Sequence, residues 1–210
     1  DLLTMEQIAV TTNLSITELI LNHRLPKKIA KVAEFINTTR GPLESRCQKE
    51  GASKPFLVKM SSWESQLDFI MDIIEEKGYT DVALLFPDNR AVKSADAYLT
   101  EKRARIESKY DIDWNAGDVK FNLDFHSENP KLMTYHSSKG LQFEAVFIPE
   151  CSMLSLPGEN VNPLYVATTR TYQDLFILYG TELTPYLSEI PKSYFEFIDK
   201  TAKSENDLPF

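Results

Sequence analysis

The segment richest in polar and reactive side chains is Met133–Phe143, which reads Met-Thr-Tyr-His-Ser-Ser-Lys-Gly-Leu-Gln-Phe. An apolar residue, Leu132, leads into it, and the strand-like run Ala145–Ile148 follows it. This pattern predicts a short buried strand, a tight turn and a return to the sheet. In open α/β folds, ligands bind at the loops that leave the carboxyl ends of the strands. We therefore expect this loop to face a ligand.

Two arginines also have the character of site residues. Arg24 follows Asn22 and His23 at the expected end of a strand, where a side chain can leave the edge of a sheet. Arg170 lies on an expected helix, in the stretch Tyr165–Arg170, whose other residues are mostly apolar or small. An arginine on a packed helix needs an acceptor. That acceptor is either an internal carboxylate or a bound anion, and the sequence leaves both open.

Alternating strands and helices are expected to position these residues. The expected strands are Ser15–Asn22, Phe56–Val58, Val82–Phe86, Asp111–Trp114, the two flanks of the 134–148 segment, and Leu175–Tyr179. The expected helices run from Pro26 to Ile36, from a capping box at Ser61 and Glu64 to Gly78, from Asn89 to Ser108, and from an N-cap at Asn162 to Tyr172.

Loops are expected at Thr38–Lys54 and Ala116–Pro130, with a lead-in at residues 1–14 and a C-terminal extension at residues 181–210. Strands that alternate with helices produce a parallel sheet covered by helices on both faces. The predicted fold is therefore a single α/β domain of residues 1–210, a three-layer sandwich with a mostly parallel central sheet.

The bulk composition excludes several classes of protein. A net charge of −8 and a pI of about 5.0 mean that the chain alone should bind nucleic acid weakly, so any such contact needs a local groove or a partner domain. Two cysteines predict free thiols in a reducing cytoplasm. No apolar run reaches the length of a membrane span, and scattered histidines without carboxylate or cysteine clusters predict no metal site.

The run Ser137–Gly140 superficially resembles a phosphate-binding P-loop. A P-loop, however, requires a Gly-rich backbone that leads to Gly-Lys-Ser/Thr at the start of a helix. This chain has no such sequence. If it acts on a nucleotide, it supplies only part of the site.

Taken together, three stretches resemble the second RecA-like domain of superfamily 1 helicases of the UvrD/Rep type. Asn22–Arg24 resembles motif IV of that family (usually Asn-Tyr-Arg), Thr134–Phe143 resembles motif V (Thr-x-His-Ser-x-Lys-Gly-Leu-Glu-Phe), and Leu164–Arg170 resembles motif VI (Tyr-Val-Ala-x-Thr-Arg). The segment Val82–Arg90 resembles the strand and helix between motifs IV and V. The resemblance implies a RecA-like fold, related to P-loop NTPases but without a P-loop of its own.

The resemblance also implies a composite ATPase. The first RecA-like domain of the same full-length protein would hold the P-loop lysine, Mg²⁺ and the base that positions water. Arg24 and Arg170 would be arginine fingers that reach the γ-phosphate of ATP, and His23, Gly140 and Gln142 would contact the nucleotide. A planar, permanently charged guanidinium suits the charge that develops on a transferring phosphoryl group.

Motif V in this family also faces the polynucleotide. The resemblance places Thr134, His136 and Ser137 near the backbone of single-stranded or duplex DNA, or of RNA. From the residues alone, the favoured interpretation of His136 is a loop histidine that hydrogen-bonds the turn. Lys139 either contacts a phosphate or ties the loop to a neighbouring carboxylate.

Three features depart from the family pattern. Gln142 replaces a Glu and so loses a charge, and His23 replaces a Tyr that stacks on the base. The charged residues that often precede motif VI are absent before Asn162. In addition, the interval from Trp114 to Lys131 is too short for the subdomain that many members insert there, because minimal domains need about 40 residues.

The sequence thus predicts the C-terminal motor half of a cytoplasmic, ATP-dependent DNA helicase or translocase, inactive as an isolated chain. The rival hypothesis is a non-catalytic RecA-like module for protein contacts or regulation, in which Gln142 and His23 mark the loss of nucleotide binding.

Overall fold

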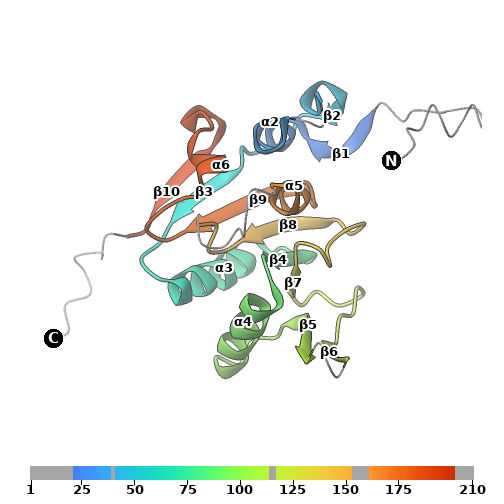
Figure 1. Cartoon of the computed structure of the whole chain (residues 1–210), viewed down its shortest axis with the longest axis vertical. Coiled ribbons are helices and arrows are strands. Elements are labelled where there is room, and N and C mark those ends of the chain that lie inside the picture. The colour runs from blue at the N-terminus through green and yellow to red at the C-terminus, as the bar shows by residue number, and fades with distance from the viewer. Residues whose placement is uncertain (1–20, 39–40, 114–116, 153–160, 202–210) are drawn as a thin grey trace, which may run out of the picture.

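The computed structural model describes residues 21–38, 41–113, 117–152 and 161–201. Within them the strands form one eight-stranded sheet, in the order β10-β3-β9-β8-β4-β7-β5-β6, and a separate two-stranded ribbon, β1-β2 (Figure 1). Several expectations fall on other residues: the lead-in 1–14, most of the strand Ser15–Asn22, Trp114, and residues 202–210 of the C-terminal extension all lie outside the described part.

The central sheet is almost entirely parallel. Only the β5–β6 pair is antiparallel, and the other pairs, from β10–β3 to β5–β7, run in the same direction. This confirms the predicted α/β fold with its mostly parallel sheet. The strands are β1 Asn22–Pro26, β2 Cys47–Lys49, β3 Phe56–Lys59, β4 Val82–Phe86, β5 Glu107–Asp113, β6 Asp118–Phe121, β7 Lys131–Thr134, β8 Phe143–Ile148, β9 Thr171–Tyr179 and β10 Glu196–Asp199.

Helices cover both faces of the sheet. Figure 1 shows α3 and α4 on one side, and α2, α5 and α6 on the other. The helices are α2 Lys27–Ile36, α3 Trp63–Lys77, α4 Asn89–Glu101, α5 Asn162–Thr168 and α6 Pro185–Ser188, with 3₁₀ turns η2 Glu44–Arg46 and η4 Lys192–Tyr194. None of the described helices is both long enough and apolar enough to cross a membrane.

The middle strand shows why the sequence folds into three layers. Successive side chains of a strand point to opposite faces. In β4, Ala83 and Leu85 pack in the apolar cluster under α2 and α5, whereas Leu84 and Phe86 pack in the cluster under α3 and α4. All these side chains are buried, so the uninterrupted apolar run of β4 is the pattern of a strand covered on both faces.

Helix ends follow local chemistry. Helix α3 begins with a reciprocal capping box between Ser62 and Ser65, one residue later than the predicted box at Ser61 and Glu64. It ends as predicted at Gly78, whose backbone is left-handed with φ of 66°. Serine replaces glutamate in the box because its hydroxyl also reaches the N-cap backbone N–H.

Two predicted helices are too long. Helix α4 ends at Glu101, not at Ser108, because Arg103 adopts a left-handed φ of 62° and the chain then pairs with β7 as strand β5. Helix α5 ends at Thr168, not at Tyr172, because Thr171 already pairs with Phe143. In both cases strand pairing overrides helix propensity. The predicted loops also contain the short strands β2 and β6.

Candidate functional site

The motif V loop, residues 135–142, runs from the carboxyl ends of the parallel strands back to their amino ends. We call these two sides of the sheet its carboxyl edge and its amino edge. Thr134 ends β7 level with Phe86, the last residue of β4, so it lies at the carboxyl edge. Phe143 and Thr171 begin β8 and β9 as partners, so the residues just before them lie at the amino edge. The loop therefore crosses the full height of the sheet. The predicted site residues divide between its two ends.

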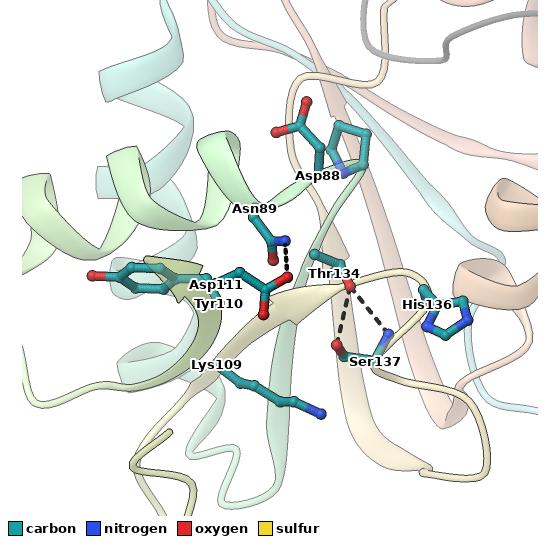
Figure 2. Close-up of a pocket in the computed structure, with 9 residues that line it drawn as sticks. Asp88, Asn89, Lys109, Tyr110, Asp111, Thr134, His136 and Ser137 are labelled. Carbon is teal, nitrogen blue, oxygen red and sulfur yellow. Dashed lines mark hydrogen bonds between the residues drawn. The ribbon is translucent and has the colours of Figure 1, made fainter. Parts of the chain in front are cut away.

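At the carboxyl edge, the loop forms one wall of a pocket of about 330 Å³ (Figure 2). The predicted residues Thr134, His136 and Ser137 all line it. The other walls come from the segment after β4 and from β5. They consist of Pro87, Asp88, Asn89, Lys109, Tyr110 and Asp111.

The start of the loop is fixed by short-range hydrogen bonds. The Thr134 Oγ1 atom accepts from the Ser137 backbone N–H, and it lies 3.1 Å from the Ser137 Oγ atom. The buried Ser138 hydroxyl donates to the Tyr135 carbonyl. Gly140 has a left-handed φ of 84°, which a residue without Cβ adopts at little cost. The turn thus holds the Thr134 and Ser137 hydroxyls at the pocket.

His136 is exposed, and its ring makes no hydrogen bond within the described residues. Within the described residues, His136 therefore does not hydrogen-bond the turn, which was the other interpretation drawn from the sequence. Lys139 is likewise exposed without a carboxylate partner among them. Figure 2 shows the His136 ring beside the pocket, on the same side as Ser137.

Asn89, Lys109 and Asp111 were not among the predicted site residues. The Asn89 side-chain amide donates to the Asp111 carboxylate at 2.7 Å, which joins the segment after β4 to β5 across the pocket. For Asn89 a signal existed in the sequence, because Asp88-Asn89 directly follows a buried strand. Lys109 and Asp111 had none, because no local pattern showed that β5 pairs with β7, the strand that ends at Thr134.

Asp88 is the N-cap of α4 and also lines the pocket. Burial on its own raises the pKa of this carboxyl, but the hydrogen bond from the Ala91 backbone N–H and the Arg90 guanidinium outweigh it and hold the pKa below its usual value. Asp88 therefore remains ionised at neutral pH, and its charge lies at the positive end of the helix dipole.

At the amino edge, the two predicted arginines contact neighbouring residues of the loop, one through a side chain and one through a backbone carbonyl. The Arg24 Nη1 atom donates to the Gln142 Oε1 atom at 3.1 Å. The Arg170 Nη1 atom donates to the Leu141 carbonyl at 3.4 Å. Arg24, Gln142 and Arg170 thus come together around residues 141 and 142, although they are far apart in the sequence.

Arg170 lies in the turn between α5 and β9, not on the helix as predicted. Its guanidinium also donates to the Val166 carbonyl and to the Thr169 hydroxyl, each at 3.0 Å. Burial lowers the pKa of this guanidinium below its usual value. All these acceptors are uncharged, and an internal carboxylate, the alternative left open by the sequence, pairs with neither arginine within the described residues.

Two predicted residues, His23 and Gly140, remain to be placed. His23 is exposed on β1 beside Arg24, which lies inside the strand and not at its end. Gly140 lies on the motif V loop, which we also call the crossing loop, between the residues at the carboxyl edge and those at the amino edge. The structure therefore brings together two sets, Arg24 with Gln142 and Arg170, and Thr134 with His136 and Ser137.

Comparisons with known proteins bear on the family and the fold. Residues 131–178, which run from β7 to near the end of β9, match the family model of the UvrD-like helicase C-terminal domain. A protein of Acanthamoeba polyphaga mimivirus, named as a candidate ATP-dependent DNA helicase, is 25% identical over 211 residues, with 89% of this chain and 30% of the relative aligned. This chain therefore spans less than a third of that relative.

The fold matches a solved structure. It is that of the C-terminal domain of a possible DNA helicase from Lactobacillus plantarum, with a TM-score of 0.64 and 16% identity, covering 84% of this chain and 98% of that one. At this identity the likeness concerns the fold alone. Together with the family match, it confirms the resemblance drawn from the three motifs: this chain is similar in sequence and fold to the C-terminal, second RecA-like domain of UvrD-like helicases.

Proposed function

We propose that this chain is the second motor domain of an ATP-dependent DNA helicase or translocase. On this proposal it supplies Arg24 and Arg170 to an ATPase site whose P-loop and Mg²⁺ belong to a first RecA-like domain, and it contacts a single strand through Thr134, His136 and Ser137. The observation that carries the proposal is the convergence of both guanidinium groups on residues 141 and 142.

The arginines suit an anionic ligand. Each guanidinium contacts only neutral acceptors within the described residues, so its charge is not compensated by a carboxylate there. The γ-phosphate of ATP would provide that compensation, and the bidentate geometry of arginine suits phosphate oxygens. Arg170 is held by backbone carbonyls and is prearranged for this role. Arg24 is exposed, and among the described residues its guanidinium contacts only the Gln142 side chain, which a phosphate would replace.

The crossing loop provides a physical connection between the two ends of the site. Leu141 and Gln142 contact the arginines, and five to eight residues earlier in the chain Thr134 and His136 line the pocket at the other edge. A change in the arginine contacts therefore displaces backbone that leads directly to the proposed polynucleotide contact. ATP-dependent closure of the two domains would alter the grip on the strand through this loop.

The test joins the chain to the P-loop domain of its parent protein. The expected result is that Arg170→Ala or Arg24→Ala lowers kcat about a thousandfold, the typical value of an arginine finger. The matched control is Arg105→Ala, because Arg105 is exposed and lies between α4 and β5, away from residues 141 and 142. The chain alone should not hydrolyse ATP, and robust turnover by it would contradict the composite site.

A second candidate function is a non-catalytic RecA-like module. The observation that favours it is the internal engagement of Arg24 by the neutral Gln142 side chain. The same experiment distinguishes the two functions. If Arg170→Ala leaves the ATPase activity of the joined protein unchanged, the chain is a non-catalytic module and not a motor domain.

A further inference from the structure

An exposed aromatic side chain lies beside the carboxyl-edge pocket, and the proposed function does not account for it. Phe121, on the edge strand β6, is 60% exposed. It pairs directly with Lys109 of β5, whose ammonium group lies 5.6 Å from the centre of the ring. Lys109 in turn lines the pocket with His136 and Ser137 (Figure 2), so one side chain contacts both the ring and the pocket.

The register determines which side chains share this face. Residues directly opposite one another in an antiparallel pair project to the same side. Lys109 and Phe121, and likewise Asp111 and Val119, therefore lie on one face of the β5–β6 pair, the face that adjoins the pocket. We call these four residues the β5–β6 face.

The opposite face of the same pair is held firmly. There Tyr110 and Lys120 reach the carboxylate of Asp96 on α4, with contacts of 3.2 and 2.8 Å, and the Ser108 hydroxyl donates to it at 2.8 Å. Asp96 is only 7% exposed. The β5–β6 pair is thus anchored through one face, and it presents the other in a fixed orientation.

We propose that the β5–β6 face is a stacking site for one base of a single nucleic-acid strand that continues from the pocket. This inference rests on the proposed function. An exposed ring offers a stacking surface to any base, and the adjacent ammonium of Lys109 suits the phosphate that follows. Stacking on a side chain requires an unpaired base, so the ligand is a single strand and not a duplex.

The composition of the face also argues against a protein partner. The core of a protein interface is depleted in charged residues. Here each of the two apolar side chains of β6 lies directly opposite a charged side chain of β5, Phe121 opposite Lys109 and Val119 opposite Asp111. The Asp111 carboxylate accepts a hydrogen bond from the Asn89 side-chain amide, at the junction with the pocket. Isolated rings among polar groups are typical of strand-binding surfaces.

The test measures binding of a fluorescein-labelled oligothymidylate to the 210-residue chain at low salt, by fluorescence anisotropy. Phe121→Ala should weaken binding at least about fivefold, the low end of the range for one stacked base, and Phe121→Tyr should restore it. The matched control is Phe197→Ala. Phe197 is 58% exposed and lies on β10, at the other end of the same sheet.

A second measurement does not depend on affinity. An oligonucleotide that carries 5-iodouracil should cross-link to Phe121 on irradiation, and mass spectrometry of the peptides locates the adduct. Circular dichroism of each variant checks that it is folded. Cross-links confined to other residues would overturn the proposal.

The outcomes also separate this inference from the proposed function. Binding that is lost in His136→Ala but unchanged in Phe121→Ala overturns the stacking site and leaves the proposed function intact. Binding that is unchanged in both His136→Ala and Phe121→Ala also contradicts the proposed contact of the pocket residues with a nucleic-acid strand. Absence of binding by the unsubstituted chain overturns the stacking site, and the arginine substitutions in the joined protein then decide the proposed function separately. If Phe121→Ala instead weakens only the association with the P-loop domain, the face is a protein contact.

Discussion

Arg24 and Arg170 differ in how firmly the protein holds them. Arg170 is partly buried and donates to the Leu141 and Val166 carbonyls and to the Thr169 hydroxyl. Arg24 is exposed and donates to the Gln142 side chain. Ordering a long side chain costs conformational entropy. Arg170 has already lost most of this freedom, whereas Arg24 would lose it on binding a phosphate, so the two proposed fingers differ in their degree of preorganisation.

At the same scale, the lowered pKa of the Asp88 carboxyl makes the stability of the protein depend on pH. This pKa is lowered in the folded protein by the Ala91 N–H and the Arg90 guanidinium, which outweigh burial. The resulting stabilisation is complete above the unfolded pKa of about 3.9 and is lost as the pH falls through the folded pKa. Asp88→Ala should lower the free energy of unfolding by about 1 kcal/mol at neutral pH, and less in acid.

Urea unfolding at pH 7 and at acidic pH measures this difference. The control is Ser62→Ala, because Ser62 caps α3 through a hydroxyl that does not titrate. Its cost should be similar at both pH values. An Asp88→Ala cost that does not change with pH would show that the carboxylate charge adds nothing to the cap.

At the scale of elements, the crossing loop depends on Gly140. An L-residue in the left-handed region costs roughly 1–2 kcal/mol. A Cβ at Gly140 would meet no atom within 4 Å, so the cost of Gly140→Ala comes from backbone strain alone. We expect the variant to be less stable by about this amount and to bind oligothymidylate more weakly, because the turn positions the Thr134 and Ser137 hydroxyls.

The matched control is Gly41→Ala. Gly41 also has a left-handed φ, of 71°, and a Cβ there would likewise meet no atom within 4 Å, but this glycine lies near η2 and far along the chain from the loop. If the two variants lose the same stability but only Gly140→Ala binds oligothymidylate more weakly, the loop geometry is responsible for the weaker binding. If both variants lose stability and binding equally, the weaker binding results from the loss of stability.

The β5–β6 pair depends on the buried carboxylate of Asp96. Asp96→Asn removes the charge that faces Lys120 and leaves an amide opposite two hydroxyls. Hydrogen bonds to charged groups contribute about 1.5–3 kcal/mol, so we expect a loss of that order in urea unfolding. The control Asp68→Asn affects an exposed pair with Lys102 and should cost less than about 1 kcal/mol. Similar costs at both sites would contradict the anchoring role of Asp96.

At the scale of the whole molecule, the two thiols report on the stability of the core. Cys47 and Cys151 are buried free cysteines in the cluster under α2 and α5. Burial raises the pKa of Cys47 to about 11 and that of Cys151 to about 12. Neither thiolate forms in the folded protein near neutral pH, so a thiol reagent should label both only after the core opens.

The sign of the pH effect follows from the same shifts. In the unfolded chain both thiols ionise near pH 8.5, whereas in the folded protein they remain protonated to higher pH. Their contribution to stability is therefore complete below about pH 8.5 and declines as the pH rises towards the folded values. Labelling with Ellman's reagent in increasing urea measures the opening, and fast labelling of Cys151 without urea would contradict a closed core.

The sequence determined the layers and the motif residues. The apolar run Val82–Phe86 has no polar face, so it can only be a strand covered on both sides, and it is β4 to the residue. Gly78 ended a helix because its missing Cβ permits a left-handed turn. The residues Thr134, His136, Ser137, Arg24 and Arg170 were identified from short motifs, because such motifs are local in the chain.

Only the tertiary structure decided how these residues are grouped. Arg24, Gln142 and Arg170 meet because β8 and β9 begin side by side, a pairing that no local pattern encodes. Only the end of β5, within the predicted strand Asp111–Trp114, was expected, and β6 was predicted as loop, because β5 forms by pairing with β7 and β6 by pairing with β5. Long-range pairing is decided by the free energy of the whole sheet, and that same pairing places Lys109 and Phe121 beside the pocket.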